Sequence, residues 1–169
     1  MLERLLEAGL AFWLVLFGWL SIGNGPEQPA TTATSSETVV TWVIDGDTFA
    51  IATGERVRLL GVDTPERDEC YYQEATDFLR DWLEGETVRL EVDERETDVY
   101  DRLLRYVFVN REPDGTATST ELLVNDVLLQ RGYADYLPIG PDRRYRLRFR
   151  ESWEAAQALE RGRWGVCGE

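Results

Sequence analysis

Acidic and basic side chains that could act on a charged substrate gather in three short stretches of the sequence. These stretches are IDGDT at residues 44–48, RLLGVDTPE at 58–66 and TDVYDR at 97–102. Carboxylate oxygens suit hard cations such as Ca²⁺ or Mg²⁺, and arginine guanidinium groups suit phosphate oxygens. Together the stretches indicate a site that combines a hard cation, a carboxylate base and a pair of arginines.

Asp47, Asp63 and Thr64 are the candidate metal ligands. Asp47 follows a tight Asp-Gly turn and Asp63 lies at the end of a β-rich run, so a meander of strands can bring both carboxylates to one end of a barrel. Pro65 restricts Thr64 to an extended conformation, which fixes the direction of the Thr64 carbonyl as a third oxygen ligand. Asp45 is explained by the geometry of the turn itself.

Glu66, Arg58 and Arg102 are the candidate catalytic residues. A glutamate beside a bound cation can accept a proton from an attacking water molecule, which is general-base catalysis. Two guanidinium groups can bind phosphate oxygens and stabilise the charge that develops in a transition state. Surface ion pairs with the acid-rich exterior are the alternative role for both arginines, although such pairs contribute little energy.

The composition excludes several other kinds of catalytic site. The chain of 169 residues has no histidine, and all 18 of its basic residues are arginine. A Ser-His-Asp triad, a histidine-ligated metal and a P-loop lysine are therefore excluded, and two cysteines alone cannot hold zinc. The chemistry must come from carboxylates, arginines and hydroxyls.

The net charge of −14 is unusual for a protein with a polyanionic partner, because charges of the same sign repel. At 1 M salt the Debye length falls to about 3 Å, and this long-range repulsion nearly vanishes. The acidic surface and the lack of lysine therefore predict a halophilic protein. Acidic drift in a GC-rich genome is the alternative explanation of the composition.

Short β-rich runs follow one another from residue 38 onward. The runs at 38–44, 47–53 and 56–62 are separated by Asp-Gly and Thr-Gly-Glu, which are hairpin signals, and they predict a three-stranded meander. Two further strands are expected at 87–92 and 104–110, on either side of a charged loop. The sequence thus predicts five strands.

Helical patterns occur between and after these strands. Apolar residues at helical spacing predict a helix at 71–83, and two more are expected at 121–131 and 145–160, each followed closely by a glycine. Three strands, a helix, two strands and two helices is the order of an α+β protein that is mainly β barrel. We expect a five-stranded OB-fold Greek-key barrel with about three helices.

The N-terminal part of the chain differs in composition from the rest. Residues 8–22 are apolar throughout, and we expect residues 1–23 to form an apolar helix that is either a cleaved signal segment or a retained membrane anchor. Residues 24–37 have the Gly, Pro, Ser and Thr content of a linker, followed by the globular domain at 38–169. These features predict an extracytoplasmic protein. A helix packed on the domain is the alternative for the apolar segment.

Taken in order, IDGDT, RLLGVDTPE and T-D-x-Y-x-R resemble the signature of the staphylococcal-nuclease (thermonuclease) family over about residues 39–164. The resemblance implies a Ca²⁺-dependent endonuclease that cleaves DNA and RNA with little sequence preference and leaves 3′-phosphate ends. It also implies the role of each site residue: Ca²⁺ binding by Asp47, Asp63 and the Thr64 carbonyl, action on the attacking water by Glu66, and phosphate binding by Arg58 and Arg102.

The chain departs from the family pattern at the residue before the second arginine. Asp101 stands where the family commonly has glycine; aspartate tolerates a left-handed backbone, but its charge could weaken phosphate binding at Arg102. Tyr133 and Tyr136 lie in the region where the family places tyrosines, although the local sequence does not align residue by residue, and they are candidate platforms for stacking on a base or sugar. Core packing is the alternative role for both rings.

Cys70 and Cys167 are the only cysteines of the chain. A disulfide between them would tie the first helix to the C-terminus, and an extracellular setting permits it. Loop-closure arithmetic gives such a link a value of about 4 to 5 kcal/mol. Two free buried thiols are the alternative.

Two other functions compete with the nuclease. One is a binding module, an OB-fold barrel that holds nucleic acid or a protein without cutting it. Such a module has no use for Arg58, Glu66 and Arg102, and all three are present. The other is a membrane-tethered structural domain. The sequence indicates DNA or RNA as substrate and the membrane as a partner of the N-terminal segment, and it indicates no obligate protein partner.

Overall fold

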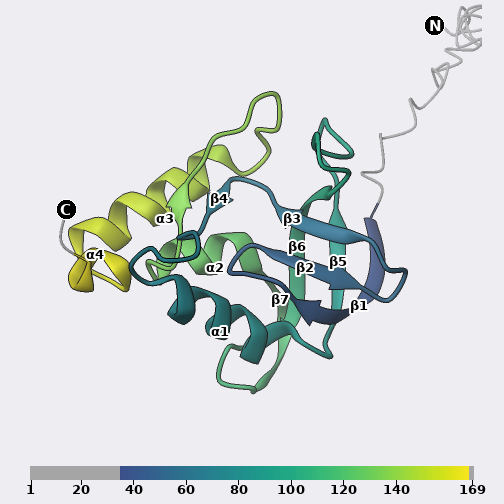
Figure 1. The fold of residues 1–169 in the computed structure, drawn as a ribbon, viewed down its shortest axis with the longest axis horizontal. Helices are drawn as coiled ribbons and strands as arrows, with labels where there is room; N and C mark the ends of the chain where they lie inside the picture. The colour runs from purple at the N-terminus through teal and green to yellow at the C-terminus, as the bar shows by residue number, and fades with distance from the viewer. Residues whose placement is uncertain (1–34, 168–169) are drawn as a thin grey trace, which may run out of the picture. The chain divides into compact units, whose positions relative to one another are not determined.

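The structure is a computed structural model that describes residues 35–167 (Figure 1). The expected apolar segment at 1–23 lies outside these residues, as does most of the expected linker at 24–37. Within the described part, no helix is long and apolar enough to cross a membrane. The first strand begins at Ser35, somewhat before the expected start at residue 38.

Five β-strands form a closed barrel. Neighbouring strands follow the order β3-β2-β1-β5-β6, and β6 also pairs in parallel with β3, which closes the barrel. The other pairs are antiparallel, and β1 serves two of them because its first half pairs with β5 and its second half with β2. The predicted five-stranded OB-fold barrel is confirmed. The strands are β1 Ser35–Val43, β2 Thr48–Ile51, β3 Arg56–Leu59, β5 Thr87–Glu91 and β6 Leu103–Arg111.

A sixth strand corrects one predicted boundary. Residues 121–131 were expected to be helical, but Ala117–Leu123 forms strand β7, and helix α2 begins only at Val124. The end of β7 pairs with β6, with Leu123 opposite Phe108. Hydrogen bonds to a neighbouring strand therefore decide the conformation of residues 121–123, although their apolar spacing also suits a helix.

Within residues 35–167, four helices accompany the barrel (Figure 1). Helix α1 follows its prediction closely, and the apolar face with Ala75, Leu79 and Trp82 is buried against the core. Helix α3 lies against α2 and against the short strand β8 (Asp135–Tyr136), and the short α4 was not predicted. The helices are α1 Tyr72–Leu83, α2 Val124–Gln130, α3 Arg146–Ala158 and α4 Arg163–Val166.

A second, two-stranded sheet positions the end of the predicted third strand. The run at 56–62 is interrupted at Gly61, which has a positive φ of 76° and lies so close to the Phe149 ring that a Cβ would approach within 2.6 Å. The chain then forms β4 (Val62–Asp63), which pairs with β8 (Asp135–Tyr136). Asp63 thereby lies opposite Asp135 in this second sheet.

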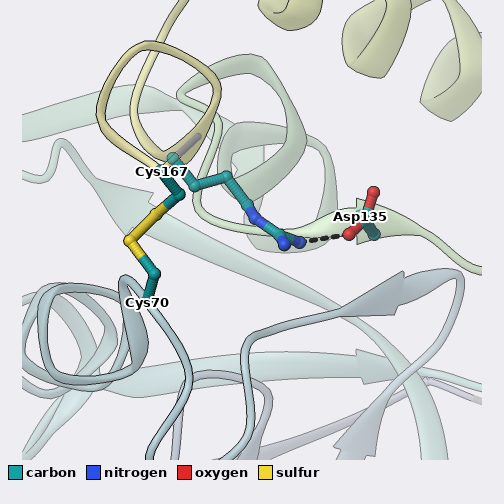
Figure 2. Close-up of a disulfide and its surroundings, with 4 residues drawn as sticks. Cys70, Asp135 and Cys167 are labelled. Carbon is teal, nitrogen blue, oxygen red and sulfur yellow. Dashed lines mark hydrogen bonds and ion pairs between the residues drawn. A yellow bond between two sulfur atoms is a disulfide. The ribbon is translucent and has the colours of Figure 1, made fainter. Parts of the chain in front are cut away.

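Two long-range connections fix the C-terminal part of the chain. A disulfide joins Cys70, just before α1, to Cys167, just after α4, with their Cα atoms 5.9 Å apart (Figure 2). An ion pair between Arg163 and Asp135 then joins α4 to β8. The fully buried Asn125 of α2 donates to the carbonyl of Leu60 at 2.8 Å, which binds this helix to the barrel.

Candidate active site

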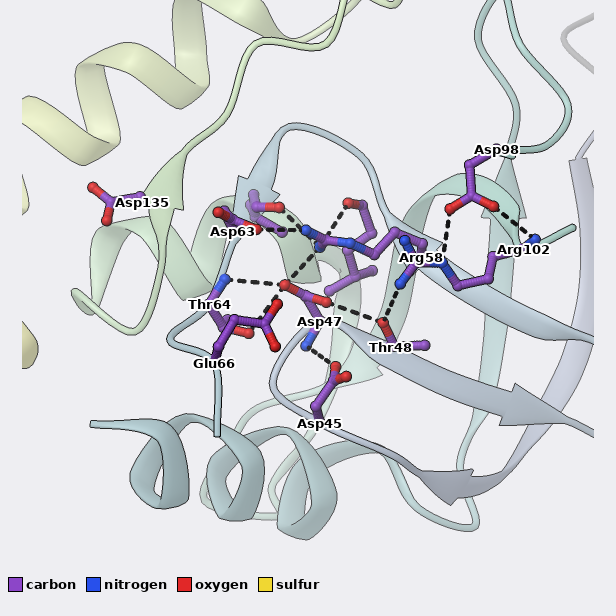
Figure 3. Close-up of polar contacts among 12 residues, drawn as sticks. Asp45, Asp47, Thr48, Arg58, Asp63, Thr64, Glu66, Asp98, Arg102 and Asp135 are labelled. Carbon is purple, nitrogen blue, oxygen red and sulfur yellow. Dashed lines mark hydrogen bonds and ion pairs between the residues drawn. The ribbon is translucent and has the colours of Figure 1, made fainter. Parts of the chain in front are cut away.

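Arg58 lies at the centre of the candidate site and contacts both predicted metal-binding carboxylates (Figure 3). From β3, its Nη1 is 2.6 Å from Oδ2 of Asp47 and its Nη2 is 2.7 Å from Oδ1 of Asp63. Nη1 also donates to the main-chain carbonyl of Val62 at 2.9 Å. The guanidinium is buried, so its orientation is fixed by these partners before any substrate arrives.

Asp47 is buried and accepts hydrogen bonds at both carboxylate oxygens. Oδ2 accepts from the main-chain N–H and the hydroxyl of Thr64, each at 3.0 Å, and Oδ1 accepts from the hydroxyl of Thr48 at 3.0 Å. The Asp45 carboxylate accepts from the Asp47 N–H at 3.1 Å and shapes the turn. Gly46 is required there, because a Cβ would lie 2.7 Å from Thr64 Oγ1.

The surroundings of Asp47 do not fully compensate for its charge. Burial, opposed by the positive charge of Arg58, raises the pKa of Asp47 to about 6 from an ordinary value of 3.8. The negative charge of Asp45 adds to this rise. A buried carboxylate with a raised pKa gains from a further positive charge nearby, which is what a bound cation would provide.

Arg102 reaches the same region from the other side of the barrel end. Its Nε donates to Oδ2 of Asp98 at 2.7 Å, and its main-chain N–H donates to Oδ1 at 3.0 Å. Its Nη1 lies 3.4 Å from the hydroxyl of Thr48, which in turn donates to Asp47. Burial tends to raise the pKa of Asp98, but the hydrogen bonds from Arg102 outweigh it and lower that pKa.

Asp101 adopts the left-handed conformation that was expected of the residue before Arg102. Its φ is 59°, within the region that favours glycine. The turn is held by the Asp98 side chain, which accepts from the main-chain N–H of Tyr100 at 2.9 Å. The side chain of Asp101 itself is exposed.

Glu66 lies in the loop between β4 and α1. Its main-chain N–H donates to the carboxylate of Glu69 at 2.8 Å, and its own side chain is exposed. Figure 3 shows this side chain pointing toward Asp47 and Thr64. Because the loop runs from Asp63 to the disulfide at Cys70, it is anchored at both ends.

The two predicted tyrosine platforms lie in different environments. Tyr133 is half-buried, and its ring stacks on Phe78 of α1 with centroids 4.2 Å apart. Tyr136 of β8 is also half-buried and lies 6.5 Å from the ring of Trp153. Tyr133 thus contributes to the contact between α1 and the loop after α2, whereas Tyr136 lies beside β4.

The candidate ligands are oxygen atoms, which are the atoms that hard cations prefer. Among residues 35–167, no three Asp, Glu, Cys or His side chains lie close enough together to hold a metal ion by themselves. The expected ligands include only two carboxylates, Asp47 and Asp63, which share one guanidinium. The Asp63 side chain is 48% exposed, and its Oδ2 accepts no hydrogen bond from the described residues. Oxygen is therefore available for Ca²⁺ or Mg²⁺.

Comparison with known proteins agrees with this geometry. A family model described as "Staphylococcal nuclease homologue" matches residues 56–165. The protein named Thermonuclease from Staphylococcus hyicus is 32% identical over 152 residues, which cover 83% of this chain and 84% of that protein. The chain belongs to the staphylococcal nuclease family. Among other nuclease-family relatives, the Thermonuclease of Staphylococcus intermedius is 32% identical over 165 residues and 92% of each chain. An "Uncharacterized endonuclease" of Escherichia coli O157:H7 is 32% identical over 95 residues, 54% of this chain and 55% of that protein.

In this nuclease-family chain, sequence reasoning did not assign two residues that position the site. Asp98 lies in the TDVYDR stretch four residues before Arg102, and that spacing was a usable signal for a carboxylate that holds the arginine. Asp135 lies opposite Asp63 and binds Arg163, and no local pattern marks it because its partners are far away in the sequence.

Proposed function

We propose that this protein hydrolyses phosphodiester bonds in DNA and RNA with little sequence preference and leaves 3′-phosphate ends. The observation that supports this most strongly is the position of Arg58, whose buried guanidinium binds both Asp47 and Asp63 and is thereby ordered in advance. The relatives named Thermonuclease and endonuclease favour the same conclusion. The activity would be that of a metal-dependent endonuclease.

Two arginines bind the phosphate in this proposal. Arg58 and Arg102 approach from opposite sides, and both are held by carboxylates that fix their side chains. Guanidinium groups remain charged at all relevant pH values and make paired hydrogen bonds to phosphate oxygens. They would therefore stabilise the charge that accumulates on those oxygens as water attacks phosphorus.

Calcium is the proposed cofactor. Asp47 and Asp63 would hold it, and the carbonyl of Thr64 would be the third protein ligand. When bound, the cation supplies the positive charge that makes the diester easier to attack. The raised pKa of Asp47, caused first by burial, supports the need for a positive charge at this position.

Glu66 is the proposed general base. Its exposed carboxylate points toward the Asp47 side of the site, where an attacking water molecule would lie. From there it would accept the proton of that water or hold the water by a hydrogen bond. The loop that carries it is anchored by β4 and the disulfide, which keeps the base near the phosphate.

A non-catalytic OB-fold module that binds nucleic acid or protein is the alternative function. The pair of Arg102 and Asp98 favours catalysis. Asp98 holds Arg102 both at Nε and at its main-chain N–H, and a module that only binds the nucleic-acid backbone does not require an arginine ordered in this way. We also propose that the protein works outside the cytoplasm in a salty environment, secreted or anchored through its N-terminal segment. The location rests on the apolar N-terminal sequence, and the salty environment rests on the acidic composition without lysine.

Digestion of single-stranded DNA tests the proposed function. The full chain would be assayed with Ca²⁺ or with chelator, in dilute and in multimolar salt, beside Arg102→Ala. Arg80→Ala is the matched control, because Arg80 also pairs with an aspartate, Asp77, one helical turn away. We expect Ca²⁺-dependent cleavage that Arg102→Ala slows by about 10²- to 10³-fold and that Arg80→Ala leaves at the wild-type rate. Equal products with and without chelator would contradict the metal mechanism, and no cleavage in any condition would favour the binding module.

A further inference from the structure

Basic residues are concentrated in one part of this acidic chain. Five of the 18 arginines lie between residues 143 and 150, a stretch that contains no acid, although the whole chain carries −14. The stretch forms the turn before α3 and the first part of that helix. Where a generally repulsive surface reverses its sign locally, a polyanion can approach.

Not all of these arginines are available to a ligand. Arg144 is held by Glu91 at 2.6 Å and Arg148 by the buried Asp126 at 2.7 Å, so both serve to dock α3. Arg146 differs from them, because it is exposed and forms no ion pair with any residue of the described part. Its guanidinium remains free to bind an anion.

Arg146 lies at a shallow hollow beside strands β4 and β8. Tyr136 and Gly61 also line this hollow, and the Tyr136 hydroxyl makes no hydrogen bond to another described residue. Burial raises the pKa of Tyr136, and the positive charges of Arg146 and Arg150 oppose the rise, which places both guanidinium groups near that ring. The hollow thus offers a free hydroxyl donor and a free guanidinium together.

Asp142 is the one carboxylate among the described residues that line the hollow, and both of its oxygens are occupied by other partners. Its Oδ1 accepts from the main-chain N–H groups of Glu94 and Arg95 at 2.9 and 3.0 Å, and its Oδ2 accepts from Arg95 Nε at 2.8 Å. Its charge is therefore compensated within the fold. Arg146 does not need to neutralise it.

The hollow adjoins the proposed catalytic site through β4 and β8. Tyr136 is the direct partner of Val62 in this sheet, and the carbonyl of Val62 accepts a hydrogen bond from Arg58 at 2.9 Å. Asp63, the next residue, binds the other end of the same guanidinium. The hollow and the Arg58 site are therefore joined by the same pair of short strands.

We propose that Arg146 and the Tyr136 hydroxyl bind a second phosphate of the substrate strand, next to the diester held at Arg58. The inference rests on the proposed function and extends it. The preferred substrate is then a polynucleotide, because it can be held at two phosphates. A dinucleotide has one internal phosphate and is held only at Arg58. A guanidinium and a hydroxyl donor are suited to one phosphate group.

Salt-dependent binding tests this directly. A fluorescent single strand of about 12 nucleotides, within the range of site sizes for one OB-fold, would be titrated in chelator at several NaCl concentrations. Each phosphate contact to a single strand contributes about 0.7 to the slope of log K against log salt. We expect Arg146→Gln to lower the slope by about 0.7, and Arg146→Lys to restore it.

Arg161→Gln is the matched control, because Arg161 is exposed, forms no ion pair with the described residues, and its guanidinium donates to the main-chain carbonyl of Gln130. It should leave the slope unchanged. With Ca²⁺, Arg146→Gln should raise KM for the long strand and leave kcat/KM for a dinucleotide as in the wild type. An unchanged slope in Arg146→Gln, or no binding by the wild type, would overturn the inference. Absence of cleavage alone would overturn the proposed function and leave the binding result valid.

Discussion

Asp98 holds Arg102 at two points, accepting from its Nε at 2.7 Å and from its main-chain N–H at 3.0 Å. The carboxylate touches no proposed reacting atom, so it is a positioning residue. Its contribution depends on two separate oxygens, because one orders the turn and the other directs the side chain of the arginine.

Asp98→Asn should lower kcat without unfolding the protein. The amide oxygen can still accept from the main-chain N–H groups, whereas the acceptor for Arg102 Nε is lost. We expect a decrease of about 10-fold, smaller than the 10²- to 10³-fold loss typical when a transition-state donor is removed, as in Arg102→Ala. The double variant should be no slower than Arg102→Ala. Glu154→Gln, which changes another i,i+4 pair with Arg150, is the control, and additive losses in the double variant would contradict the positioning role.

Asp101→Gly should stabilise the protein and raise its activity. A non-glycine residue at φ 59° costs roughly 1 kcal/mol, which glycine avoids, and the change removes a negative charge next to Arg102. Asp101→Asn separates the two effects, since asparagine tolerates the same backbone without the charge. The midpoint temperature of thermal unfolding should rise in Asp101→Gly and not in Asp101→Asn, while KM for DNA should fall in both variants. A higher KM in either variant would show that the carboxylate assists substrate binding.

Removal of the disulfide should destabilise the protein substantially. Cys70 and Cys167 are 97 residues apart, and closing so long a loop stabilises a fold by up to about 4 to 5 kcal/mol. Denaturant unfolding of the Cys70→Ser/Cys167→Ser variant should reveal most of that loss. Reductant should produce the same decrease in the wild type and none in the variant. An unchanged wild-type unfolding curve after addition of reductant would mean that the disulfide does not contribute to stability.

Calcium affinity should fall in mild acid. Burial, opposed by Arg58, raises the pKa of Asp47 to about 6, and a metal ligand must be deprotonated to bind. Below that pH the carboxylate becomes neutral, so each further decrease of one pH unit should weaken Ca²⁺ binding by about tenfold. Calorimetric titration with Ca²⁺ between neutral pH and pH 5 measures this. A constant affinity across the range would exclude Asp47 as a ligand or place its pKa much lower.

The barrel could be predicted because its signals are local. Asp45 and Gly46 define a turn from their own chemistry, and alternation of apolar residues marks the strands on either side. The same is true of α1, whose buried face follows helical spacing. At residues 121–123 local pattern failed, because pairing between Leu123 and Phe108 joins segments that no local rule connects.

The candidate site also has a part that the sequence predicts and a part that it does not. Asp47, Asp63 and Arg58 could be proposed together because strand order brings neighbouring turns to one end of a barrel. The interruption at Gly61 and the pairing of Asp63 with Asp135 could not be predicted from the sequence, because both depend on how α3 packs against the barrel. Long-range packing thus sets the details of a site whose residue types are visible in the sequence.

The most direct test of the central claim compares two arginines that are each held by two carboxylates. Arg58 binds Asp47 and Asp63, whereas Arg89 binds Glu91 and Glu121 on another part of the barrel. Ca²⁺-dependent hydrolysis of single-stranded DNA would be measured for Arg58→Lys and Arg89→Lys, with circular dichroism to verify folding. We predict a loss of about 10²- to 10³-fold in kcat for Arg58→Lys and wild-type turnover for Arg89→Lys. Folded Arg58→Lys protein with wild-type turnover would contradict the assignment of this site as catalytic.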